Sequence, residues 1–149
     1  MNDQDGLSQL LTFEYAAVYG YGLASAVLAT AVPPAQAALA LAVAGLQTHH
    51  DRRDALTQRI VAAGGTPPPG DAAYRYPRPD GAAAALALIA DIEDSVAAAC
   101  HDVLGRLDRG SLRTEVATFL GNAATTAARA RLLSGAGPAR ATTAFPGGA

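Results

Sequence analysis

Four long segments of the chain place core-compatible residues at alternating steps of three and four, the spacing that lines one face of an α-helix. These segments cover residues 5–30, 34–63, 80–109 and 111–135. Helices with such stripes bury them by packing against one another around a common core. The pattern therefore predicts an all-α fold, and specifically a four-helix bundle.

The stripe of the first helix consists of Leu7, Leu11, Glu14, Val18, Tyr21, Ser25 and Leu28, and that of the second of Leu39, Val43, Leu46, His50, Arg53, Thr57 and Ile60. The third stripe consists of Leu86, Ile89, Glu93, Val96, Cys100, Val103 and Leu107, and the fourth of Leu112, Val116, Phe119, Ala123, Thr126, Ala130 and Leu133. Glu14, His50 and Glu93 occupy positions where the pattern favours apolar side chains. Because buried polar groups need partners, we expect these three to meet in the interior.

The segment between the second and third helices is rich in proline and cannot be helical. Residues 66–79 contain Pro67, Pro68, Pro69, Pro77 and Pro79. At about 3 Å per residue, an extended proline-rich chain of this length spans roughly 40 Å, which is enough to cross the whole bundle. The sequence therefore predicts a long crossover, with Tyr74 and Tyr76 fastening it to the helices. Residues 1–135 are expected to form the bundle, and residues 136–149 an irregular tail on which Phe145-Pro146 could dock.

Composition excludes several classes of protein. A formal charge of −2 on 149 residues indicates neither a nucleic-acid partner nor an anionic membrane surface. The single cysteine, Cys100, cannot form a disulfide within the chain, and the acidic start lacks the features of a signal peptide, so we expect a cytoplasmic protein. No formally charged residue lies between Glu14 and Asp51, which could suggest a membrane hairpin. Alanine dominates that span, however, and favours a soluble helix pair.

The helix connections allow the heights of the polar residues to be compared. Glu14 lies about eighteen residues before the Val32-Pro33 turn and His50 about seventeen residues after it, so at about 1.5 Å per residue the two lie at nearly the same height. On the fourth helix, the residues expected at the height of Glu93 are Asn122, Thr125 and Thr126. They include no carboxylate and no imidazole. The predicted polar site therefore draws its charged groups from three helices.

Two motifs carry a resemblance to a known family. The residues Glu-Tyr-Ala-Ala-Val-Tyr at 14–19 and His-Asp-Arg-Arg-Asp-Ala-Leu at 50–56 are similar to motifs of an actinobacterial group of ferritin-like proteins of unassigned function. The resemblance to the ferritin-like superfamily spans nearly the whole chain. It implies a ferritin-like four-helix bundle in which two helices each give a lone glutamate and two each give a Glu-x-x-His motif to a pair of iron or manganese ions.

Carried over by position, the resemblance makes Glu14 and Glu93 the lone glutamates. Gln47 and His50 stand where one Glu-x-x-His motif would be, with glutamine replacing the carboxylate, and residues 122–125 stand in place of the other. Two metal ions are neutralised by about four carboxylates, whereas this interior offers two, so a dinuclear centre is disfavoured. One ion held by Glu14, His50 and Glu93 is an alternative.

A metal-free network is the other alternative. In it, Glu14 and Glu93 accept hydrogen bonds from His50, Tyr15 or Arg53, and the guanidinium replaces the charge of a metal. We therefore expect a non-catalytic bundle without a cofactor, forming a homodimer, with a polar pocket for a small ligand or partner. The pocket would be lined by Glu14, Tyr15, Gln47, His50, Arg53 and Glu93. The competing prediction is a mononuclear iron or manganese protein or oxidase with Glu14, His50 and Glu93 as ligands.

Overall fold

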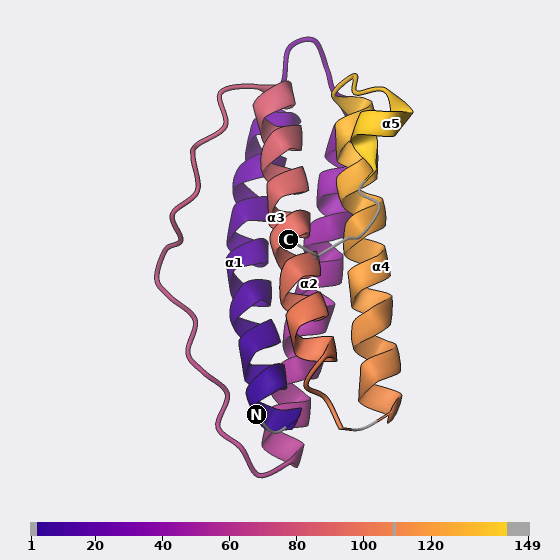
Figure 1. Ribbon diagram of the computed structural model, residues 1–149. Helices are drawn as coiled ribbons and strands as arrows, with labels where there is room; N and C mark the ends of the chain where they lie inside the picture. Colours follow the sequence, from indigo (N-terminus) through magenta and orange to yellow (C-terminus); the bar gives the residue numbers. More distant parts are fainter. Residues whose placement is uncertain (1–2, 109, 143–149) are drawn as a thin grey trace.

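The computed structural model describes residues 3–108 and 110–142 of the chain. Four long helices and one short helix follow one another as α1 (Asp3–Ala29), α2 (Gln36–Ala62), α3 (Ala82–Leu104), α4 (Gly110–Leu133) and α5 (Pro138–Ala141). The long helices lie side by side (Figure 1). The predicted all-α four-helix bundle is therefore confirmed.

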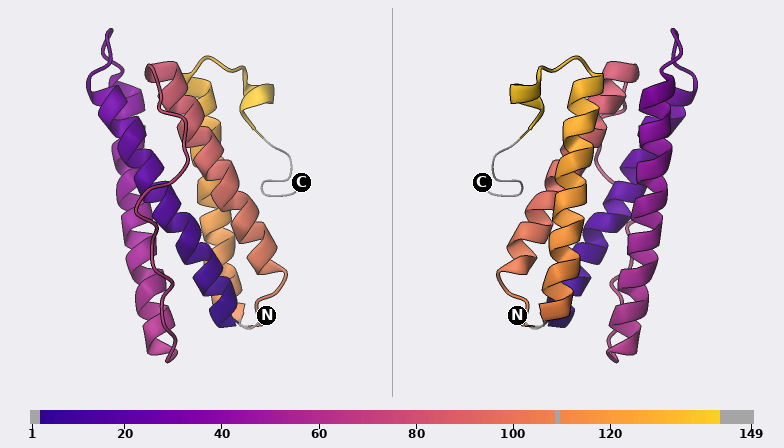
Figure 2. Two further views of the ribbon diagram at one scale, coloured as in Figure 1. Left: turned by 90° about the vertical axis from the view of Figure 1, so that its left-hand side faces the viewer. Right: turned by 90° about the vertical axis from the view of Figure 1, so that its right-hand side faces the viewer.

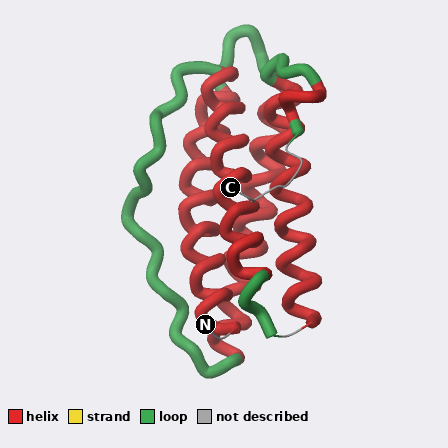
Figure 3. The backbone as a smooth tube through the Cα atoms, in the orientation of Figure 1, coloured by secondary structure: helices red, strands yellow, loops and turns green. Residues whose placement is uncertain are grey.

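The connections determine the direction of each helix. Short connections join α1 to α2 and α3 to α4, so each of these pairs is an antiparallel hairpin, and Figure 2 shows the two hairpins as neighbouring pairs. Between the hairpins, residues 63–81 run outside the bundle from one end to the other (Figures 1 and 3). Because of this crossover, α2 and α3 run in the same direction, and α1 and α4 run opposite to them.

The stripes predicted for α1 and α3 face the core. All seven predicted residues of the third stripe are buried, including Glu93. In α1, the buried members of the stripe are Leu7, Leu11, Glu14, Tyr21 and Leu28. The predicted periodicity is therefore correct for these two helices, and it places both glutamates in the interior.

The stripe predicted for α2 is wrong by one position over most of the helix, although its last member, Ile60, is buried as predicted. The buried residues of this helix are Ala38, Ala42, His49, Arg52, Leu56 and Ile60, whereas Val43 is 54% exposed. A step of one residue turns a helix by about 100°, so a different face is inward. The reason is the bulk of Tyr21: a Cβ atom at Gly45 would lie 2.3 Å from its Cε1 atom. Small residues of α2 therefore form the contact with α1.

The crossover is fastened by tyrosines, as predicted. The ring of Tyr76 packs against the core beside Gly20, and the rings of Tyr74 and Tyr19 lie 5.7 Å apart, centroid to centroid. The crossover begins after α2 ends at a glycine pair. Gly64 has φ of +79°, a left-handed conformation that glycine adopts without strain, and the N–H of Gly65 donates to the carbonyl of Ile60.

The predicted irregular tail includes a short helix, because residues 138–141 form α5, in which Ala141 is buried. The proposed docking of Phe145-Pro146 lies outside the described residues. In the part of the chain that the structure describes, no helix is both long and apolar enough to span a membrane.

Candidate functional site

A group of charged side chains lies inside the bundle near the middle of its helices. Within residues 3–108 and 110–142, the buried charged or polar side chains are Glu14 of α1, His49 and Arg52 of α2, and Glu93 of α3. Each comes from a helix face that is otherwise apolar. Charged groups placed in such surroundings are stable only when they neutralise one another.

His49 lies between the two glutamates. Its Nδ1 atom is 2.6 Å from Oε2 of Glu14, and its Nε2 atom is 3.3 Å from Oε1 of Glu93. Burial disfavours the charged imidazolium, but the hydrogen bonds to Glu14 and Glu93 outweigh that effect and raise the pKa of His49 to about 9. At neutral pH the ring is therefore a cation that donates to both carboxylates.

Tyr21 and Arg52 complete the network. The Tyr21 hydroxyl donates to Oε1 of Glu93 at 2.5 Å, and its ring lies 4.8 Å from the imidazole of His49, centroid to centroid. Burial and the Glu93 carboxylate raise the pKa of Tyr21 far above its usual range, so the phenol keeps its proton. Arg52 Nη1 is 3.9 Å from Oε1 of Glu14, and its guanidinium lies 4.6 Å from the centre of the Phe119 ring.

Several predicted site residues lie elsewhere. His50 is only partly buried, and His49 takes the inward position instead. Arg53 forms an exposed pair with Asp54, with 2.8 Å between Nη2 and Oδ1, and Arg52 takes its place inside. The predictions of His50 and Arg53 as inward residues are therefore wrong, because the stripe of α2 is shifted by one position.

Gln47 and Tyr15 are also outside the network. Gln47 is exposed and donates to Oδ1 of Asp51 at 2.8 Å. The Tyr15 ring lies beneath the crossover, where a Cβ atom at Gly70 would be 3.3 Å from it. Of the predicted pocket, the structure brings together Glu14 and Glu93. His49 and Arg52 were missed in the sequence analysis. The small residues Ala38, Ala42 and Gly45 could have identified them, because His49 and Arg52 continue the same alternating steps of four and three.

The network does not have the geometry of a metal centre. His49 faces Glu14 with one ring nitrogen and Glu93 with the other, so the two carboxylates lie on opposite sides of the imidazole. One ion cannot contact all three groups in that arrangement. Among the described residues, no cluster of three or more His, Cys, Asp or Glu side chains could hold a metal ion. The predicted ligand set of Glu14, His50 and Glu93 also fails because His50 does not join it.

A cavity of about 230 Å³ reaches this network from the surface between α2 and α4. Arg52 and Glu93 are its buried lining residues, and the exposed lining residues are Ala44, Thr48, Asn122, Thr125 and Arg129. The height comparison predicted Asn122, Thr125 and Thr126 opposite Glu93, and all three line this cavity. The two buried residues thus form its floor and the exposed ones its mouth.

Glu93, which lines this cavity, has one unsatisfied oxygen. Its Oε1 atom accepts the bond from Tyr21, but its Oε2 atom is buried and has no hydrogen-bond partner among the described residues. A buried polar atom without a partner costs about 1–3 kcal/mol, and more when it is charged. A bound molecule that donates a hydrogen bond to Oε2 would remove that cost.

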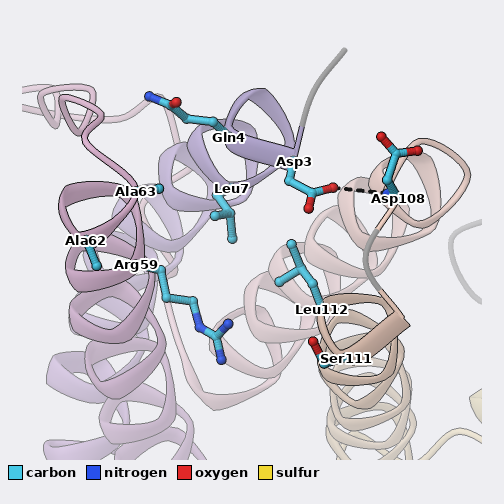
Figure 4. A pocket seen from close by; sticks show the side chains of 9 residues that line it. All are labelled: Asp3, Gln4, Leu7, Arg59, Ala62, Ala63, Asp108, Ser111 and Leu112. Carbon is cyan, nitrogen blue, oxygen red and sulfur yellow. Dashed lines mark hydrogen bonds between the residues drawn. The ribbon is translucent and has the colours of Figure 1, made fainter.

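A larger cavity, of about 710 Å³, lies at the end of the bundle where α1 begins and α2 ends (Figure 4). Two of its charged lining residues, Asp3 and Arg59, already have partners. Asp3 Oδ1 accepts a hydrogen bond from the backbone N–H of Asp108 at 3.0 Å, and Arg59 pairs with Glu115 at 2.6 Å between Nη2 and Oε2. The smaller cavity is therefore the stronger candidate for a binding site.

Comparisons with known proteins agree with the fold. A protein-family model for a domain of unknown function, DUF4439, matches residues 6–149. The chain is also similar in structure to a conserved hypothetical protein, rv2844, from Mycobacterium tuberculosis, with a TM-score of 0.79 and 30% sequence identity over 88% of this chain and 96% of that chain. A comparison with the curated proteins finds no match. The function therefore has to be argued from the site.

Proposed function

The chain belongs to the DUF4439 family, domains of unknown function, and we propose that it is a non-catalytic helical bundle that binds a small polar molecule between α2 and α4. The observation that carries this proposal is that Glu93, whose Oε2 atom is buried without a partner, lines a cavity open to the surface. Sites for small molecules combine a concave surface with a few fixed polar groups of this kind.

Binding fits the site better than catalysis does. Both nitrogens of His49 face carboxylates, which leaves no free imidazole to act as a general base. Burial raises the pKa of the Cys100 thiol to about 12, so this cysteine is not a nucleophile at neutral pH. The network therefore serves to fix the floor of the cavity.

The resemblance to ferritin-like proteins supports a metal-free interior of this kind. If the resemblance holds, Glu14 and Glu93 take the places of the lone glutamates of that superfamily, and the positive charge of Arg52 replaces that of the metal. The alternative function, a mononuclear iron or manganese protein, requires three ligands around one point. His49 separates Glu14 from Glu93, so the donor set does not fit that function.

A thermal-shift screen tests the proposal. The wild-type protein is heated with sugars, amines, carboxylates, and carboxylates that also carry an amino or hydroxyl group. We expect one class to raise the melting temperature by about 5–10 °C at a concentration a hundred times its dissociation constant. Thr125→Leu, at the mouth of the cavity, should abolish the shift.

Thr118→Leu is the matched control. Thr118 and Thr125 are both exposed residues of α4, and each hydroxyl donates to the carbonyl four residues earlier. Thr118 does not line the cavity, so its substitution should leave the shift intact. If no class stabilises the wild type, or if Thr125→Leu leaves the shift unchanged, the proposed function is wrong.

A further inference from the structure

Arg52 lacks the acceptors that a buried guanidinium requires. Its side chain is 7% exposed, and its nearest carboxylate oxygen, on Glu14, is 3.9 Å away. No hydrogen bond from its guanidinium reaches another described residue. The five N–H groups of an arginine form a planar fork that matches a carboxylate. Contact with the Phe119 ring steadies that fork at the floor of the cavity, where an acceptor from a bound molecule would complete it.

Glu93 has the opposite requirement. Its Oε2 atom accepts only and is buried without a partner, and Glu93 lines the same cavity. The threonines around it do not supply a donor, because the hydroxyls of Thr48, Thr125 and Thr126 each donate to the carbonyl four residues earlier in their own helix. Their oxygens therefore offer lone pairs to the cavity. A molecule bound there must bring an N–H or O–H group.

The positive charges at the cavity indicate the second group that the ligand carries. Arg129 lies at the mouth of the cavity and has no carboxylate partner among the described residues. Together with Arg52 it favours an anionic group. A simple carboxylate, which carries no proton at neutral pH, would satisfy the arginines but bring no donor to Glu93. A simple amine would satisfy Glu93 but leave Arg52 without an acceptor.

We infer that the cavity between α2 and α4 binds a small amino- or hydroxycarboxylic acid, with its carboxylate toward Arg52 and Arg129 and its amino or hydroxyl group toward Glu93. This inference rests on the proposed function and names the class of its ligand. The volume of about 230 Å³ suits a molecule of this size and excludes a polymer.

Four compounds of similar size test the inference. Alanine and lactate carry both groups, propionate lacks the donor, and isopropylamine lacks the carboxylate. Binding is measured by isothermal titration at neutral pH. We expect alanine or lactate to bind at least ten times more tightly than propionate and isopropylamine. Equal binding of propionate would overturn the role of Glu93, and equal binding of isopropylamine would overturn the role of the arginines.

Substitutions test the contact with the donor group of the ligand and the contact with its carboxylate separately. Glu93→Gln should weaken binding of the preferred acid at least tenfold, whereas Glu115→Gln, in the ion pair with Arg59, should leave it unchanged. If Glu93→Gln does not fold, as judged by circular dichroism, the exposed Arg129→Gln variant tests the anionic half and should weaken binding at least threefold. Unchanged affinity in whichever of these two cavity variants folds would overturn the inference.

The outcomes separate this inference from the proposed function. If a sugar or a simple amine stabilises the wild type, and Thr125→Leu abolishes that stabilisation, the cavity is a binding site but the ligand class is wrong. If no compound of any class binds, both are wrong.

Discussion

His49 stabilises the interior because it forms hydrogen bonds with both Glu14 and Glu93, whose carboxylates would otherwise repel each other. Removing one partner of a buried charge network costs about 3–5 kcal/mol, because the remaining charges stay buried without compensation. We therefore expect His49→Gln to lower the free energy of unfolding by about that amount, measured by urea denaturation. The neighbouring substitution His50→Gln should change it by less than about 0.5 kcal/mol, because His50 lies outside the network. Equal losses in the two variants would contradict this assignment.

The raised pKa of His49 makes stability depend on pH in a defined direction. The value rises from 6.5 for a free imidazole to about 9 in the folded protein, so the folded state binds the proton more tightly. The resulting stability, about 3 kcal/mol, is fully present below pH 6.5 and is lost as the pH rises through 9.

Tyr21 and Cys100 contribute a smaller loss of stability in the same direction. Folding raises the pKa of Cys100 from 9.0 to about 12 and that of Tyr21 above its usual value of 10.0, so the unfolded state loses these protons first as the pH passes 9. Urea denaturation at pH 6.5 and 9.5 should therefore show a loss that is about 3 kcal/mol smaller in His49→Gln than in the wild type. A loss of the same size in the variant would assign it to another group.

Which residues face inward could be predicted from the sequence only in part. Glu14 and Glu93 interrupt rows of large apolar residues, so their inward position is visible in the spacing. His49 and Arg52 follow a row of small residues instead, and the larger Leu39, Val43 and Leu46 point to the wrong face. Small residues become the inward face when a partner helix supplies the bulk, and that information lies in another segment of the chain.

At the scale of the helices, the contact between α1 and α2 depends on Gly45. A Cβ atom there would lie 2.3 Å from Cε1 of Tyr21, whose hydroxyl is held by Glu93. Gly45→Ala should therefore lower the free energy of unfolding by about 1–3 kcal/mol, the typical cost of overpacking, although alanine favours helix. Urea denaturation measures the effect.

Gly22→Ala is the matched control for that substitution. Gly22 also lies inside a helix, but none of the described atoms outside its own helix backbone comes within 4 Å of a Cβ placed there. Its substitution should raise the free energy of unfolding by about 0.5–1 kcal/mol through helix propensity alone. If Gly45→Ala stabilises the protein by a similar amount, the close packing of Tyr21 against α2 is wrong.

At the scale of the whole molecule, the arrangement of the helices was largely predictable. Three signals determine it: the spacing of core residues, the proline-rich segment that cannot be helical, and the short connections within each hairpin. The cavity was less predictable, because it depends on how far α2 and α4 stand apart. The height comparison identified its residues on α4 but could not show that they enclose a space. The expected homodimer remains a prediction.

We propose that the bundle neutralises its buried glutamates with His49 and Arg52 rather than with a metal ion. The most direct measurement is the metal content of the protein, by plasma emission, after purification from cells supplied with iron and manganese. We expect far less than one equivalent of either metal per chain, with no change in the His49→Gln variant. About one equivalent in the wild type, lost on that substitution, would contradict the claim.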